Sequence, residues 1–173
     1  MIFSIFATFK VLIMSNFLIY LQLKPFIAQW LVHSFGNPVR FPDCSRENAC
    51  ILRNTLRRPD GVPVETAAEG LTPICIPDSK HHPPVTYNYM NQTGKAELIA
   101  YIEALFTINW QNELLYLVRD QVNDRVAIHA YCERHGIDVD YDNTIWQRFN
   151  RWKQQMERRG LDFKKKNKNH KKR

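Results

Sequence analysis

Proline placement sets the strongest limit on how this chain can fold. Six of its nine prolines fall between residues 59 and 84. Proline lacks the backbone N–H that helices and sheet ladders use, and it disfavours helical backbone at the residue before it. The stretch is therefore predicted to be a loop-rich connector with at most an edge strand, which the sequence LTPICI places at 71–76.

The region before the connector mixes strand and helix signals. Apolar residues alternate between Phe17 and Leu23 and predict a mostly buried strand. Residues 24–36 predict a helix, because Pro25 suits the first helical turn and Gly36 follows the last apolar residue.

A second helix is predicted from Ser45 or Arg46 to Arg57, with Asp43 or Ser45 as its cap. Over that range Arg46, Arg53 and Arg57 share one face, since offsets of seven and four residues return to the same side of a helix. That face suits phosphates, or it is a solvated or ion-paired surface. The residues alone leave both interpretations open.

From Thr93 onward the sequence is helical in character. Four helices are predicted, over residues 95–106, 110–118, 125–135 and 142–159. A break is expected near Asn109 and a stop at Gly136. The predicted caps are Thr93, Asp124, and Asp142 or Asn143. The fold class expected from these signals is α+β: a small mixed α/β N-terminal portion over 14–92, an all-helical, helix-turn-helix-like portion over 93–160, and a disordered basic tail over 161–173.

The first 23 residues admit three interpretations. Lys10 is the only charged residue before Lys24, so the run resembles a membrane segment, although a charge in mid-span is costly. An export signal needs a positive start and a small-residue cleavage site, and neither pattern is present. In the third interpretation Met14 is the working start, and residues 1–13 are a loosely attached apolar extension before the strand.

Positive charge gathers at the C-terminal end. The chain has a formal net charge of +7, and residues 145–173 contain twelve basic and two acidic residues. Seven of these basic residues lie in the last ten: Lys164, Lys165, Lys166, Lys168, Lys171, Lys172 and Arg173. A positive block of this kind favours a polyanion as partner, either nucleic acid or anionic lipid.

The last predicted helix has two contrasting faces. Four large apolar residues recur at spacings of four, three and four and form a buried stripe: Ile145, Phe149, Trp152 and Met156. The opposite face carries arginines and amides, which suit bidentate contacts with DNA base edges or, beside them, with phosphates. The predicted nucleic-acid-binding residues of this helix are Gln147, Arg148, Asn150, Arg151, Gln154 and Arg158.

Residues 125–159 resemble a helix-turn-helix DNA-binding unit, in which a first helix and a turn precede a recognition helix with a basic outer face. The link from Gly136 to Asp142 is longer than the usual turn of such a unit. Its acids, Asp138, Asp140 and Asp142, would lie poorly beside phosphates, or they act as caps favoured by the helix dipole. A helical hairpin with a basic surface is the alternative interpretation.

Sequence motifs for catalysis or metal binding do not stand out. The cysteines form no Cys-x-x-Cys pair, and the adjacent His81 and His82 would point apart in an extended segment. The sequence contains no Walker, G-x-S-x-G or G-x-G-x-x-G motif. Hence neither a metal, nor another cofactor, nor a catalytic residue is expected, and four reduced cysteines fit a cytoplasmic protein.

These features together predict a small non-enzymatic DNA-binding protein that uses its last helix and its lysine-rich tail. Its expected role is that of a regulator or of an accessory factor of a mobile element, and DNA is favoured over RNA. The alternative is a membrane-associated interaction protein, anchored by residues 1–23, whose basic tail lies on anionic lipid.

Overall fold

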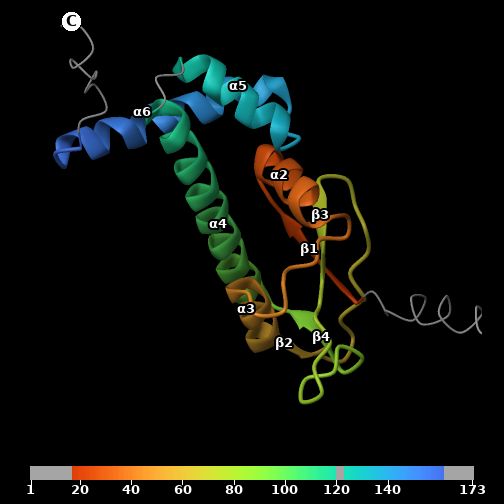
Figure 1. The fold of residues 1–173 in the computed structure, drawn as a ribbon. Helices are drawn as coiled ribbons and strands as arrows, with labels where there is room; N and C mark the ends of the chain where they lie inside the picture. The colour runs from red at the N-terminus through yellow and green to blue at the C-terminus, as the bar shows by residue number, and fades with distance from the viewer. Residues whose placement is uncertain (1–16, 120–122, 162–173) are drawn as a thin grey trace, which may run out of the picture. The chain divides into compact units, whose positions relative to one another are not determined.

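The computed structural model describes residues 17–119 and 123–161. Within these ranges it contains five α-helices and short antiparallel strand pairs, which confirms the α+β class (Figure 1). Contacts divide the described residues into two compact units, 17–23 with 35–102, and 24–34 with 103–119 and 123–161. Each unit therefore draws on separate stretches of sequence, and the helix after the first strand belongs with the C-terminal helices.

The first unit contains a strand pair near the start of the described chain. β1 (Leu18–Gln22) runs antiparallel to β3 (Leu71–Cys75), with Ile19 opposite Ile74. Both isoleucines are buried. The strands predicted from the alternation after residue 16 and from the sequence LTPICI are thus confirmed. Because β3 lies in the middle of the proline-rich connector, its pairing with β1 holds the connector against the first unit.

α3 (Arg46–Asn54) begins where the sequence predicts. The Ser45 hydroxyl accepts a hydrogen bond from the N–H of Asn48 at 3.1 Å, so Ser45 is the cap. In the predicted arginine face, Arg53 is paired with Glu97 on the first turns of α4. For this arginine the ion-paired interpretation is confirmed.

The helix ends three residues earlier than predicted. Thr55 takes extended backbone, and its carbonyl oxygen accepts a hydrogen bond from Nε2 of His82 at 2.7 Å. The chain then continues as β2 (Thr55–Arg57), which pairs antiparallel with β4 (Tyr87–Met90). The prediction that Arg57 shares a helix face with the other arginines is wrong, because Arg57 lies on a strand.

α4 (Gln92–Arg119) is one continuous helix, and the break predicted near Asn109 is wrong. Asn91, rather than Thr93, satisfies the start of the helix, since its side-chain oxygen accepts a hydrogen bond from the N–H three residues on at 2.8 Å. Asn109 stays helical, with its side-chain oxygen accepting a 2.8 Å hydrogen bond from the hydroxyl of buried Tyr131. α4 supplies residues to both units.

The second unit is helical and has an aromatic core. α2 (Pro25–Phe35) buries Phe26 and Trp30, whose ring centroids lie 5.7 and 5.3 Å from that of Phe106. Aromatic pairs at these separations stabilise a core beyond the area that they bury. The helix predicted at 24–36 is confirmed.

Most of the apolar N-terminal run lies outside the described residues. Of residues 1–23, the structure describes 17–23, and Leu18–Gln22 of this part form β1. Over the described ranges, no helix combines the length and the apolar character that crossing a bilayer requires. The predicted tail beyond residue 161 also falls outside the described chain.

Candidate nucleic-acid interface

Three consecutive elements of the second unit form the candidate interface. α5 (Asp124–Arg134) is followed by η1 (Val139–Tyr141), a single turn of 3₁₀ helix, and by α6 (Asp142–Arg158). Both α-helices match their predicted limits to within one residue. The cap of α5 is Asn123 rather than Asp124, because the side chain of Asn123 accepts a hydrogen bond from the N–H of the second helical residue at 2.9 Å.

The turn after α5 requires glycine for two reasons. Gly136 has a φ of 63°, a left-handed conformation that other residues rarely adopt. A Cβ atom at this position would also lie 2.8 Å from the ring of His33 on α2. The next N–H, that of Ile137, donates to the carbonyl oxygen of Cys132 at 2.9 Å and closes the helix end. The stop predicted at Gly136 is therefore confirmed.

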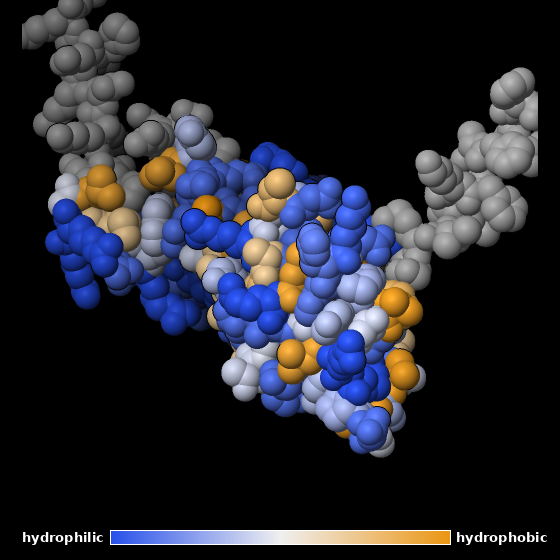
Figure 2. All heavy atoms as spheres, turned by 90° about the horizontal axis from the view of Figure 1, so that it is seen from below, coloured by the Kyte–Doolittle hydropathy of each residue, from blue (hydrophilic) through white to orange (hydrophobic). Residues whose placement is uncertain are grey.

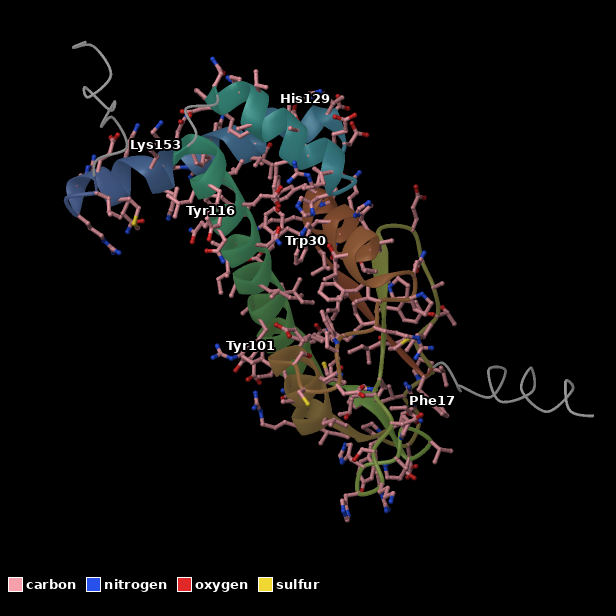
Figure 3. All side chains as sticks on the ribbon, in the orientation of Figure 1. Phe17, Trp30, Tyr101, Tyr116, His129 and Lys153 are labelled. Carbon is pink, nitrogen blue, oxygen red and sulfur yellow. The ribbon has the colours of Figure 1, made fainter. Side chains whose placement is uncertain are left out.

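Two ion pairs connect α5 and α6, one at the first residue of each helix. Asp124, the first residue of α5, accepts from Nζ of Lys153 on α6 at 2.8 Å. Asp142, the first residue of α6, lies 2.8 Å from Nδ1 of His129 on α5 (Figure 3 labels Lys153 and His129). The hydrogen bond to Asp142 raises the pKa of His129 above its ordinary value. These pairs fix α6 against α5.

One of the acids before α6 caps the 3₁₀ turn that precedes the helix. The Asp138 side chain accepts the N–H of Asp140 at 3.1 Å and starts η1. The position before α6 is Tyr141, which has no side-chain cap, so the cap predicted at Asp142 or Asn143 is wrong. Since Asp138 and Asp140 are both exposed, negative charge lies beside the start of α6, where it would repel another anion.

The inner side of α6 packs on aromatic residues. Ile145 and Phe149 are buried, and Trp152 is half-buried. The ring centroid of Trp110 on α4 lies 6.5 Å from that of Phe149 and 5.8 Å from that of Trp152. The predicted apolar stripe is confirmed in the first turns of α6 and becomes less buried toward Met156.

The outer side of α6 is a continuous polar stripe. Four of the predicted binding residues are exposed and recur at spacings of four, three and four: Gln147, Arg151, Gln154 and Arg158. These spacings return to one side of a helix, and the four side chains follow it over about 16 Å at 1.5 Å per residue. We call these four residues the α6 stripe.

Two other predicted residues lie away from the stripe. Arg148 is half-buried, and its guanidinium carbon is 5.0 Å from the ring centroid of Phe26 on α2. Asn150 is also half-buried. The predicted tail residues, Lys164, Lys165, Lys166, Lys168, Lys171, Lys172 and Arg173, lie outside the described chain.

Arg125 is a neighbouring cation that sequence reasoning missed. This exposed side chain of α5 places its guanidinium carbon 3.8 Å from the ring centroid of Trp146 on α6. The contact orients a positive charge beside α6 at a distance typical of cation–π pairs. The two residues belong to different helices and are far apart in sequence, so helical spacing gave no signal of it.

The described residues also bear on metal and thiol chemistry. Among residues 17–119 and 123–161, no group of three or more His, Cys, Asp and Glu side chains is arranged to hold a metal ion. Burial raises the pKa of Cys132 to about 12, and it raises the pKa of Cys50 and Cys75 as well. Burial therefore disfavours the thiolate, which is the nucleophilic form, at these three cysteines.

Comparison with known proteins identified no relative of this chain. Models of protein families, curated proteins and solved structures each gave no match to this chain. The resemblance to a helix-turn-helix unit therefore stays a prediction, and function has to be inferred from the surface of α6 and its surroundings.

Proposed function

We propose that the protein binds double-stranded DNA through the α6 stripe, and that the lysine-rich C-terminal residues add contacts to phosphates. One observation carries the proposal: the exposed residues of α6 are all arginines or amides. They are Asn143, Gln147, Arg151, Gln154, Gln155 and Arg158. A helix face that serves only solubility commonly mixes both signs of charge, whereas this one has neither an acid nor an apolar side chain.

The chemistry of the stripe suits base edges in a major groove. Arginine forms paired hydrogen bonds with guanine, and glutamine does so with adenine. The major groove of B-DNA is wide enough for an α-helix, whereas that of A-form RNA is too narrow for side chains to read. These two facts favour duplex DNA over duplex RNA as the ligand of α6.

The surroundings of α6 support a rigid presentation of the stripe. Ion pairs at Asp124 and Asp142 and the aromatic contacts of Phe149 hold the helix on α5 and α4. Contacts from rigid elements are placed more accurately than contacts from loops. Since the exposed acids Asp138 and Asp140 precede α6, we infer that the later turns of α6 enter the groove.

Phosphate contacts would come from cations outside the stripe. Arg125 lies beside α6, and seven basic residues follow in the last ten positions of the chain. Such cations release counterions from DNA and add affinity without sequence preference. A cytoplasmic, non-enzymatic regulator or accessory factor fits this combination of reading helix and basic end.

Replacing stripe arginines tests the proposal. Arg151→Ala and Arg158→Ala should each weaken binding to a selected duplex by about 1–3 kcal/mol at fixed salt. The exposed side chains should change the free energy of unfolding by only about 0.5 kcal/mol. Arg46→Ala, which removes an exposed arginine from α3, is the matched control, because it changes net charge equally. Fluorescence anisotropy measures the affinity.

Parent-like affinity of both stripe variants would reject α6 as the reading element. A parallel arm with vesicles of anionic lipid tests the membrane alternative. Sedimentation of the protein with vesicles, together with unchanged DNA binding by the stripe variants, would favour the membrane-associated protein over the DNA-binding one.

A further inference from the structure

The β2–β4 strand pair has an irregular register that gathers aromatic and basic side chains. Leu56 lies opposite Tyr89, and after a register shift Arg57 lies opposite Tyr87. A shift of this kind turns a side chain away from the regular alternation of a strand. Arg57 is exposed, and both tyrosines are half-buried.

Two rings are already stacked at this strand pair. The centroids of His82 and Tyr87 are 3.8 Å apart and their planes differ by 20°. The histidine is fixed by its hydrogen bonds to the carbonyl and hydroxyl oxygens of Thr55 at 2.7 and 3.1 Å. The pair is therefore a preformed stacking surface rather than two freely rotating side chains.

The two arginines beside the rings differ in how firmly their side chains are held by hydrogen bonds. Arg58 donates to the carbonyl oxygens of Pro63 and Asn88 at 2.7 and 3.0 Å and lies 5.8 Å from the centroid of Tyr89. Arg57 has no hydrogen bond or ion pair within the described part of the chain, and its guanidinium carbon is 5.8 Å from the centroid of Tyr87. That distance exceeds a stacking contact, so the Arg57 side chain can reach another group.

Charge within the two strands and the segment that leads into β4 has one sign, while Glu65 lines an adjoining pocket with Arg58 and Asn88. The segments 55–58 and 80–90 contain Arg57, Arg58 and Lys80 together with two histidines, and neither segment contains Asp or Glu. Figure 2 looks toward the end of the first unit at which Figure 1 places β2 and β4, and there hydrophobic residues stand in small groups among hydrophilic ones. An anionic, planar ligand suits such a surface better than a large apolar partner does.

We propose that the β2–β4 strand pair is a second nucleic-acid site, which binds a single strand by stacking a base on Tyr87 and His82 while Arg57 contacts a phosphate. Proteins that bind single strands combine aromatic platforms with cations along the backbone, and stacking accepts any base. The site belongs to the first unit and is independent of the α6 stripe. It gives the protein a ligand class that the groove-reading helix does not recognise.

The test compares two strands of equal charge. A labelled oligothymidylate of about 10 nucleotides, a typical site size, is titrated against the full-length protein beside a strand of the same length with abasic sites. The basic end of the chain contributes equally to both, because their phosphates are the same. We expect the intact strand to bind about tenfold more tightly than the abasic strand, as stacking of one base predicts.

Single substitutions test whether the difference between the two strands arises at the β2–β4 strand pair. Tyr87→Leu and Arg57→Gln should each lower affinity for the intact strand by several-fold to tenfold and leave duplex binding unchanged. Tyr116→Leu on α4 and Arg46→Gln on α3, both exposed, are the matched controls. Arg57→Gln keeps the proposal testable if Tyr87→Leu fails to fold, because Arg57 is exposed. Thermal unfolding checks each variant.

Equal binding of the intact and abasic strands would overturn the proposal. Parent-like affinity of a folded Arg57→Gln variant for the intact strand would overturn it as well. Failure here is distinguishable from failure of the duplex site, because the latter is tested by Arg151→Ala and Arg158→Ala on a different ligand.

Discussion

The α6 stripe and the β2–β4 strand pair are both basic surfaces, yet they offer different chemistry. The stripe contains arginines and amides and has no ring. The strand pair places arginines beside Tyr87, Tyr89 and His82. Hydrogen-bonding side chains in a row can discriminate base edges, whereas rings accept any unpaired base. Positive charge alone therefore does not define the ligand; the neighbours of each cation do.

The secondary structure explains part of this contrast. A helix that packs along one side leaves long side chains exposed in a row on the other side, as on α6. A two-stranded pair with a shifted register brings side chains from both strands together on one surface. The same protein can thus present a linear reading surface and a compact stacking surface.

The largest effect is expected from deleting residues 164–173, which should act on both surfaces alike. Seven cations are lost, so the slope of log affinity against log salt for duplex DNA should fall by as much as about 6. Stability should not change, because the segment is composed of charged and polar residues. A salt titration with duplex and with single strand measures both slopes, and an unchanged slope would show that these cations do not meet phosphates.

Phe149→Ala should remove the support of the stripe without touching the strand pair. The buried ring packs near Trp110, and its loss should cost about 3–5 kcal/mol of unfolding free energy. Trp152→Ala should cost less, because Trp152 is half-buried. Denaturant titration of both variants gives the values. If Trp152→Ala destabilises more than Phe149→Ala, the buried face of α6 has been assigned wrongly.

Gln154→Ala should separate base reading from stacking. If Gln154 contacts adenine, its loss should reduce discrimination at one base pair by about 1–3 kcal/mol and change affinity for other duplexes little. Oligothymidylate binding should stay at the parent level. Competition between duplexes that differ at single positions measures the preference, and an unaltered preference would assign the stripe to phosphates.

The smallest effect is expected from His129→Gln, which removes one tie between α5 and α6. The pKa of His129 is raised in the folded protein, so the ion pair with Asp142 stabilises below the unfolded value, near 6.5, and this stabilisation is lost as pH rises through the raised value. The unfolding temperature of the variant should therefore be lower than that of the parent at about pH 6 and equal to it at about pH 9. His81→Gln, at an exposed histidine, is the control. A difference that persists at high pH would point to packing instead.

Much of the local structure follows from the sequence. Alternation gave β1, and helical spacing gave α2, α5 and α6 with limits close to the observed ones. The α6 stripe was predictable because its positions are fixed by helical geometry alone. Arg148 shows the limit of that reasoning, since its contact with Phe26 depends on where α2 lies.

The errors arise where distant residues decide the backbone. Asn109 stays inside α4 with Tyr131 donating to its side chain, and β2 begins at Thr55 with His82 bonded to its carbonyl oxygen. Neither partner is near in sequence, so local propensity favoured a break in the first case and a longer helix in the second. The stacking surface on β4 was hidden for the same reason.

The turn at Gly136 limits which substitutions the chain tolerates at that position. Gly136 and Gly160 both have a positive φ, but only at Gly136 would an added Cβ meet another atom, the ring of His33, within 4 Å. Asparagine is the residue that most readily adopts this backbone after glycine. A library of all substitutions should therefore recover asparagine at position 160 and almost nothing but glycine at position 136, so that two helix ends with the same conformation tolerate mutation very differently.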